Sequence, residues 1–408
     1  MALHKHDLQK CIHCGLCLQA CPTYVATGEE AHSPRGRIYL MRSALEQRTD
    51  WQAVHPYIDA CMGCLGCQTA CPSGVPYSRL IEGARAEVER HARTPFQRWV
   101  RQQAIAHFTH RGHLRMLLGI AHRLGFRRAP RWMVRLLGAS EPAVALPTLL
   151  RARWPMQSVY LPQGSVRARV GLLIGCAQAV LFPAVHQATI RLLTLAGYAV
   201  HLPNRQNCCG ALWVHNGYPD RARHLARQLF RAFEGLDWVV VNAAGCGSTM
   251  KEYATLFADT PDAGRAQAFS ARVRDIHELL AESELPKPSF PIPFKVAYHD
   301  ACHLLHGQGI REAPRALLRQ IPELQLVELE HADMCCGSAG IYNMLQPQLA
   351  KHALARKVEA IRNSGAQVLA SPNPGCTLWI AQGLREAGLV VGVYHPVELI
   401  AKAYADRA

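Results

Sequence analysis

Residues 11–22 read CIHCGLCLQACP, and residues 61–72 read CMGCLGCQTACP. Both stretches have the spacing C-x2-C-x2-C-x3-C-P, in which three thiols leave one tight loop and a fourth precedes a proline. Thiolates at this spacing hold [4Fe–4S] clusters, and the fourth cysteine of each run ligates the cluster of the other run. The two stretches therefore predict an N-terminal domain that folds around two such clusters, so that metal binding contributes to its stability.

The crossing of ligands assigns each cysteine to one of the two clusters. Cluster 1 is expected to be held by Cys11, Cys14, Cys17 and Cys71. Cluster 2 is expected to be held by Cys21, Cys61, Cys64 and Cys67. Zinc is disfavoured because it normally uses paired C-x2-C knuckles, and c-type haem because Gly15 and Leu65 stand where that motif needs histidine. A purely structural role for the clusters is the alternative to electron transfer.

The rest of the composition fits a redox protein of a reducing compartment. The 408 residues include 16 cysteines, and no apolar run follows the N-terminal charges as it would in a secretory signal. Ordered cysteine spacing in the cytoplasm indicates metal or redox chemistry rather than disulfides. No uninterrupted apolar run of about 18 residues is present, so we predict no membrane-spanning helix.

The formal net charge of +15 is unevenly distributed. Residues 90–140 contain eleven arginines and no lysine, aspartate or glutamate. Arginines mixed with apolar residues are typical of helices that lie on an anionic membrane surface, and docking to a partner protein is the alternative. Binding to nucleic acid is not expected, because the charge lies in one segment and no nucleic-acid motif is recognised.

Cysteine content divides the chain into four segments. We predict a ferredoxin-like domain at 1–89, a basic helical linker at 90–165, and two cysteine-rich repeats at 166–285 and 286–408. Breaks between helices of the linker are expected at Gly112, Pro130, Pro142, Pro147 and Pro155. The fold class is therefore α+β multidomain: an α-helical ferredoxin-like domain with two [4Fe–4S] clusters, then a duplicated α/β cysteine-rich domain.

The duplication is visible in the cysteines of the second half. Cys176 corresponds to Cys302, Cys208 and Cys209 to Cys335 and Cys336, and Cys246 to Cys376, at offsets of 126, 127 and 130 residues. Each copy alternates three short strands with helices, which predicts parallel α/β units with cysteines just after strand ends. These eight cysteines are expected to be redox thiols or ligands of a further iron–sulfur cluster, and buried structural cysteines are the alternative.

Three histidines lie close to these cysteines in the sequence. His13 lies inside the first cluster loop, and His299 and His303 flank Cys302. Each could donate a hydrogen bond to a cluster ligand. Scattered histidines are usually ordinary packed or surface residues, which is the expectation for each of the three.

The motifs resemble those of a known family. The Cys-Cys-Gly repeats resemble the cysteine-rich domain of heterodisulfide reductase subunits, whose fullest form ends in Cys-x-x-Cys and holds a non-cubane [4Fe–4S] cluster. The matching positions here are Thr249 and Trp379. Two ferredoxin motifs followed by two such repeats resemble the iron–sulfur subunits of bacterial glycolate oxidase (glycolate dehydrogenase). That resemblance is carried by SPRGRIYLM at 33–41, GCAQ at 175–178 and CCGSAG at 335–340.

The resemblance implies one subunit of an oxidoreductase complex. No G-x-G-x-x-G follows a predicted strand, so we expect no flavin or nicotinamide site and no catalytic residue on this chain. FAD is expected on partner flavin-binding glycolate oxidase subunits, which would oxidise glycolate to glyoxylate. D-lactate would be a further substrate of these subunits. This chain would relay the electrons to a quinone-type acceptor from the cytoplasm, on the cytoplasmic face of the inner membrane.

Two related activities are kept as alternatives. Iron–sulfur subunits of lactate-utilisation systems and of anaerobic glycerol-3-phosphate dehydrogenase share the same architecture. A disulfide-reducing enzyme that acts at the C-terminal cysteines is the second alternative.

Overall fold

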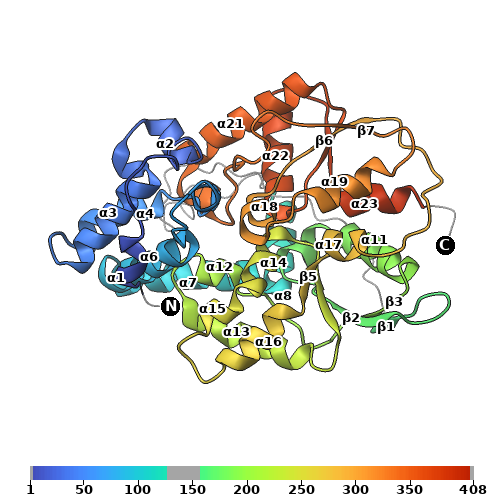
Figure 1. The fold of residues 1–408 in the computed structure, drawn as a ribbon, viewed down its shortest axis with the longest axis horizontal. Helices are drawn as coiled ribbons and strands as arrows, with labels where there is room; N and C mark the ends of the chain where they lie inside the picture. Colours follow the sequence, from blue (N-terminus) through green and yellow to red (C-terminus); the bar gives the residue numbers. More distant parts are fainter. Residues whose placement is uncertain (1–2, 126–156, 405–408) are drawn as a thin grey trace.

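The computed structural model describes residues 3–125 and 157–404. The chain forms an N-terminal helical domain and two α/β units, and the helical domain (blue in Figure 1) lies against both units. Its elements are α1 (Lys5–Gln9), α2 (Pro22–Thr27), η1 (Glu30–His32), α3 (Pro34–Leu45), α4 (Trp51–Asp59), α5 (Gly66–Thr69) and α6 (Tyr77–His91). Apolar side chains of α3, α4 and α6 pack around the cysteine loops and form the core of this domain.

The basic linker begins with two helices, α7 (Pro95–Thr109) and α8 (Arg111–Arg123). The break between them lies at His110, whose Nδ1 accepts a hydrogen bond of 3.3 Å from the His113 N–H and caps α8. The prediction of a break at Gly112 is therefore wrong by two residues. The prolines at 130, 142, 147 and 155 lie outside the described residues.

Each cysteine-rich repeat contains one sheet. The first has the strand order β1-β3-β2-β4-β5 and is parallel except for β1. The second has the order β7-β6-β8-β9 and is entirely parallel. The strands are β1 (Val159–Tyr160), β2 (Ala168–Leu172), β3 (Tyr198–His201), β4 (Trp238–Val241), β5 (Val273–Asp275), β6 (Lys295–Tyr298), β7 (Gln325–Val327), β8 (Val368–Ala370) and β9 (Gly392–Tyr394). The equivalent orders of β2–β5 and β6–β9 confirm the duplicated α/β domain.

Helices connect the strands and cover the sheets. Those of the first repeat are α10 (Ala177–Leu181), α11 (Pro183–Leu195), α12 (Ala211–Val214), α13 (Pro219–Ala232), α14 (Ala244–Lys251), α15 (Tyr253–Leu256), α16 (Ala263–Ala271) and α17 (Ile276–Ala281). Those of the second are α18 (Cys302–Gln308), α19 (Glu312–Arg319), α20 (Tyr342–Leu345), α21 (Pro347–Ser364), α22 (Pro374–Glu386) and α23 (Pro396–Lys402). A shared apolar core joins the two repeats, because α11 of the first packs on α23 of the second and α17 packs on α19.

No helix in the described ranges is long and apolar enough to cross a membrane.

Candidate metal centres

The two cysteine loops of the helical domain have the same backbone shape. His13 and Gly15 have φ values of 56° and 85°, and the equivalent Gly63 and Leu65 both have a φ of 64°. A left-handed conformation is unfavourable for His13 and Leu65, so their surroundings must stabilise it. Arg35 contributes to this, since its Nη1 donates a 2.8 Å hydrogen bond to the His13 carbonyl. The two loops thus present their cysteines in equivalent ways.

The thiols expected to hold cluster 1 lie near one another at the edge of the domain. Cys11 lies close to Cys14 and Cys71, and Cys17 lies close to Cys11. Cys14 is exposed and the other three are partly buried. Burial raises the pKa of the Cys17 thiol to about 11, so a bound metal would have to displace a proton from it.

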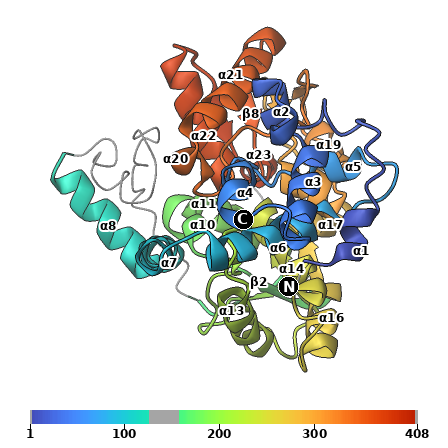
Figure 2. The ribbon, with the colours of Figure 1, turned by 90° about the vertical axis from the view of Figure 1, so that its left-hand side faces the viewer.

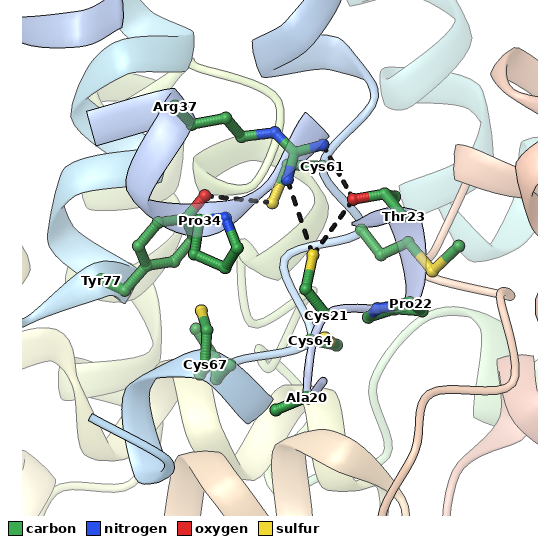
Figure 3. A pocket seen from close by; sticks show the side chains of 12 residues that line it. Ala20, Cys21, Pro22, Thr23, Pro34, Arg37, Cys61, Cys64, Cys67 and Tyr77 are labelled. Carbon is green, nitrogen blue, oxygen red and sulfur yellow. Dashed lines mark hydrogen bonds between the residues drawn. The ribbon is translucent and has the colours of Figure 1, made fainter. Parts of the chain in front are cut away.

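The thiols expected to hold cluster 2 line one internal pocket. Cys21, Cys61, Cys64 and Cys67 surround it together with Arg37 and Tyr77 (Figure 3). The Tyr77 hydroxyl and the Cys61 thiol share a hydrogen bond of 3.7 Å. Because α5 and the loop before it supply Cys64 and Cys67 while the residue before α2 supplies Cys21, the pocket joins both sequence motifs.

Arg37 provides a test of whether this pocket suits an anionic group. Its side chain is fully buried, and its guanidinium donates to the Cys21 thiol at 3.8 Å, to Thr23 Oγ1 at 2.9 Å and to the Tyr57 carbonyl at 2.7 Å. Within the described residues Arg37 forms no ion pair with a carboxylate. A buried cation needs a counter-charge, and thiolates that hold a cluster would supply it. The donor set therefore fits an iron–sulfur cluster.

In the first repeat the four cysteines form a continuous series. The Cys176 thiol contacts Cys208, Cys208 contacts Cys209, and Cys209 contacts Cys246. The Arg111 guanidinium lies near Cys176 and Cys208.

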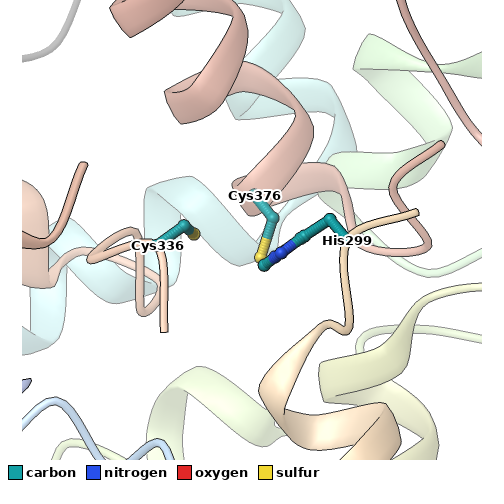
Figure 4. A group of neighbouring side chains, drawn as sticks. All are labelled: His299, Cys336 and Cys376. Carbon is teal, nitrogen blue, oxygen red and sulfur yellow. The ribbon is translucent and has the colours of Figure 1, made fainter. Parts of the chain in front are cut away.

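In the second repeat the series is repeated and extended. Cys302 contacts Cys335, and Cys336 contacts both Cys335 and Cys376. His299, at the end of β6, joins them: donor atoms of His299, Cys336 and Cys376 all lie within 4.8 Å of one another, and all three residues are buried. Figure 4 shows the Cys376 thiol against the His299 ring, with Cys336 directed toward them.

The helical domain and the second repeat meet at their sulfur atoms. A hydrogen bond with the Cys335 thiol, together with burial, raises the pKa of Cys64. Cys64 also lies close to Cys302. A cysteine of the helical domain's pocket is thus in direct contact with the cysteine series of the second repeat.

One backbone device recurs at three of these sites. The N–H of Gly63, Gly210 and Gly337 each donates at 3.4 Å to the thiol two residues earlier, in Cys61, Cys208 and Cys335 respectively. Hydrogen bonds to sulfur stabilise thiolates and influence cluster potentials. At Gly337, with a φ of 86°, a Cβ would come within 2.5 Å of the Ala350 carbonyl oxygen, so only glycine fits.

Hydrogen bonds across the interface hold the helical domain on both repeats. Arg85 donates to the His215 carbonyl of the first repeat at 2.8 Å, and the Tyr342 hydroxyl of the second repeat donates to the Ala60 carbonyl at 2.8 Å. Within the helical domain Arg85 also donates to the Cys61 carbonyl at 2.5 Å. The helical domain is therefore docked on the two repeats at a defined position.

Three further residues that the sequence singles out add no ligand to the cysteine series. His303 binds the Gly63 carbonyl at 3.1 Å, as part of the interface. Trp379 is buried and Thr249 bonds to the Gly245 carbonyl, so these positions add no sulfur donor. Arg37 was missed as a site residue, although it lies within the stretch 33–41, because only the three-dimensional structure shows that no carboxylate among the described residues pairs with it.

Comparisons with known proteins agree with this organisation. A family model described as a 4Fe-4S dicluster domain matches residues 7–75, and one described as a cysteine-rich domain matches 170–251 and 296–381. The chain is 34% identical to the probable glycolate oxidase iron-sulfur subunit of Bacillus subtilis, over 98% of this chain and 95% of that one. It is 31% identical to the glycolate oxidase iron-sulfur subunit of Escherichia coli, over 97% and 94% respectively. It is also 30% identical to a fumarate reductase (CoM/CoB) subunit of Methanothermobacter marburgensis, over 98% of this chain and 73% of the relative.

Proposed function

The chain belongs to the family of glycolate oxidase iron–sulfur subunits, and from this premise we propose that it relays electrons between two partners. The electrons would come from a flavin subunit that oxidises glycolate, and they would pass to a quinone-type acceptor. The observation that carries the proposal is the succession of thiol groups. It begins at exposed Cys14, passes through the buried pocket and reaches the second repeat where Cys64 meets Cys335. A purely structural site has no need of this continuity.

We assign two [4Fe–4S] clusters to the helical domain, which would supply one-electron redox chemistry when bound. Cys11, Cys14, Cys17 and Cys71 would hold the first, and Cys21, Cys61, Cys64 and Cys67 the second. Arg37 would neutralise part of the negative charge of the second site. The Gly63 N–H would bond to one of its ligands.

Electrons would enter at the first site, because it lies at the surface. Exposed Cys14 is flanked by the apolar side chains of Ile12 and Leu16, which are 69% and 63% exposed. An exposed apolar rim around a redox site suits contact with a partner protein. We infer that the flavin subunit docks here.

The chain needs that partner because oxidation of an alcohol removes two electrons together, for which enzymes use a flavin or a nicotinamide. The experiment is anaerobic purification of the complex, followed by dye reduction with glycolate, D-lactate and glycerol 3-phosphate. We expect activity with glycolate in the complex and none with the isolated chain. Turnover by the isolated, flavin-free chain would refute the proposed role. Preference of the complex for another substrate would assign the chain to a related dehydrogenase instead.

We propose further that α8 holds the complex at an anionic membrane surface. Leu114 and Leu118 of this helix are buried against α10, whereas Leu117, Ile120 and Leu124 are 44%, 47% and 66% exposed on another face. Exposed Arg115 and Arg123 lie on the same helix, and in Figure 2 α8 lies at the outer edge of the molecule. Basic amphipathic helices bind anionic lipid in this way.

Vesicle sedimentation tests this placement. We expect the complex to sediment with anionic vesicles and to remain in solution with neutral ones. Equal binding to both would remove the electrostatic argument, and binding to neither would assign the exposed face to a partner protein.

One observation favours a second candidate function, reduction of a small molecule such as a disulfide at the second repeat. A cavity of about 200 Å³ reaches Cys335 and is lined by Arg356, Lys357 and Ala360. Ala360→Trp should fill it, whereas Ala355→Trp on the exposed side of α21 is the matched control. Unchanged dye-linked glycolate oxidation with loss of disulfide reduction in the Ala360 variant alone would establish this activity, and no disulfide reduction by the parent protein would exclude it.

A further inference from the structure

We propose that the second cysteine-rich repeat holds an iron–sulfur cluster to which a ring nitrogen of His299 is a ligand, beside the thiolates of Cys336 and Cys376. The site stands on its own geometry, whereas its part in electron relay rests on the proposed function. The first repeat, although a copy of the second, has no such nitrogen donor.

The state of the His299 ring carries the inference. The residue has no exposed surface, and within residues 3–125 and 157–404 neither Nδ1 nor Nε2 has a hydrogen-bond partner. Two unsatisfied polar atoms in the interior are costly. A metal bound to one nitrogen would satisfy it, and a donor nitrogen of this ring already lies within 4.8 Å of two buried thiols.

The number of donors indicates more than one metal atom. His299, Cys302, Cys335, Cys336 and Cys376 form one connected group of five donors. A single tetrahedral zinc ion takes four ligands. Adjacent cysteines, which fit poorly around one ion, can each ligate a different iron of one cluster. The donor set therefore favours an iron–sulfur cluster over zinc.

The charge around the group agrees with an anionic cluster. Lys357 of α21 is buried near Cys335 and Cys336 and donates to the carbonyls of His331 at 2.8 Å and Ala332 at 3.0 Å. In the described part of the chain it forms no ion pair with a carboxylate. The thiolates of a bound cluster would therefore supply part of its counter-charge, beside the more distant carboxylates of Asp333 and Asp300.

Comparison of the two repeats shows that these polar residues are specific to the second. The strand offset that aligns Val170 with Val296 places Leu173 at the position of His299. The helix offset that aligns Ala222 with Ala350, each packed on the glycine of a Cys-Cys-Gly motif, places Leu229 at the position of Lys357. Both leucines are buried. The same fold thus accepts apolar side chains at both places, so packing alone does not require histidine or lysine.

The proposed site continues the path from the helical domain. Cys64 of the helical domain contacts Cys335, which is one of the five donors in the second repeat. Replacement of thiolate by imidazole raises the potential of iron–sulfur centres. A histidine-ligated cluster next to Cys64 would therefore favour electron flow out of the helical domain.

The test uses the full chain, reconstituted anaerobically with iron and sulfide. We expect more than the eight irons of two [4Fe–4S] clusters, no zinc, and a ¹⁵N coupling in pulsed EPR of the reduced protein when histidine is ¹⁵N-labelled. His299→Leu, which copies the first repeat, should return the count to about eight irons and abolish the coupling. His299→Cys should keep the iron, lose the coupling and shift the potential of that signal to more negative values.

His395→Asn is the matched control, because His395 is also buried in the second repeat but stacks on His277 and caps α23. It should retain both the iron and the coupling. Zinc in place of the extra iron, only eight irons in the parent, or a coupling that persists in His299→Leu would each overturn the proposal. Reduction of the N-terminal clusters by the flavin partner should be unchanged in His299→Leu, and its failure in the parent would refute the relay but not the site.

Discussion

Removal of the positive charge of Arg37 should lower the reduction potential of cluster 2. Arg37→Met keeps much of the buried volume but leaves the pocket without its cation. The guanidinium lies 3.8 Å from the Cys21 thiol. At an effective dielectric constant of about 20, one unit charge at that distance contributes about 4 kcal/mol. The electron added on reduction spreads over a cluster rather than residing on one sulfur, so we expect about half of this, ~2 kcal/mol or ~80 mV for a one-electron couple.

The measurement is an EPR-monitored redox titration of the full chain. Arg37→Lys should restore most of the potential, because it keeps the charge. Arg35→Gln is the matched control: Arg35 contacts the first loop rather than the cluster 2 pocket, and its charge is paired with Glu30 at 2.7 Å, so the potential of cluster 2 should change little. Equal shifts in Arg37→Met and Arg37→Lys, or no shift in either, would refute the electrostatic role assigned to this residue.

Three further predictions concern stability. Gly337→Ala should cost about 1–2 kcal/mol in backbone strain and about 1–3 kcal/mol more from its clash with the Ala350 carbonyl, whereas Gly388→Ala, with a φ of 68° but open space around its Cβ, should show only the strain in denaturant unfolding. Burial raises the pKa of Glu82 to about 7. The neutral carboxyl's contribution to stability is therefore present below about pH 4.5 and is lost as the pH rises to about 7. Glu82→Gln should match the melting temperature of the parent protein at pH 4.5 and exceed it at pH 8, and an equal difference at both pH values would contradict this. Oxidative removal of the clusters should lower the melting temperature of the helical domain, and an unchanged temperature by circular dichroism would exclude a contribution of metal to its fold.

Local sequence patterns predicted the elements that repeat. The β-branched run Val239–Val241 lies in β4, and Val368–Ala370 coincides with β8. The duplication allowed each element to be compared with its copy, and the ligand assignment from the thiol spacing stays a prediction. The fourth strands, β5 and β9, were not identified because no cysteine follows either of them and each contains charged residues or a glycine, which are depleted in strands.

Contacts between distant segments account for what the sequence could not reveal. The contact between Cys64 and Cys335 depends on how the helical domain docks, and no local pattern encodes it. His299 was expected to be an ordinary histidine, because composition cannot show that both ring nitrogens lack partners. Only packing distinguishes Arg35, which pairs with Glu30, from Arg37, which pairs with no carboxylate in the part of the chain that the structure describes.

The docked position of the helical domain has a consequence for the assembly of the protein. Arg85 donates both to the Cys61 carbonyl within the helical domain and to the His215 carbonyl of the first repeat, and Tyr342 of the second repeat donates to the Ala60 carbonyl. The interface is therefore closed directly beside the cluster 2 pocket. Cys61 and Cys67 are buried in the closed form. We therefore expect iron and sulfide to enter this pocket before the helical domain docks on the repeats. We expect exchange or oxidative loss of a cluster in this pocket to proceed no faster than the interface opens.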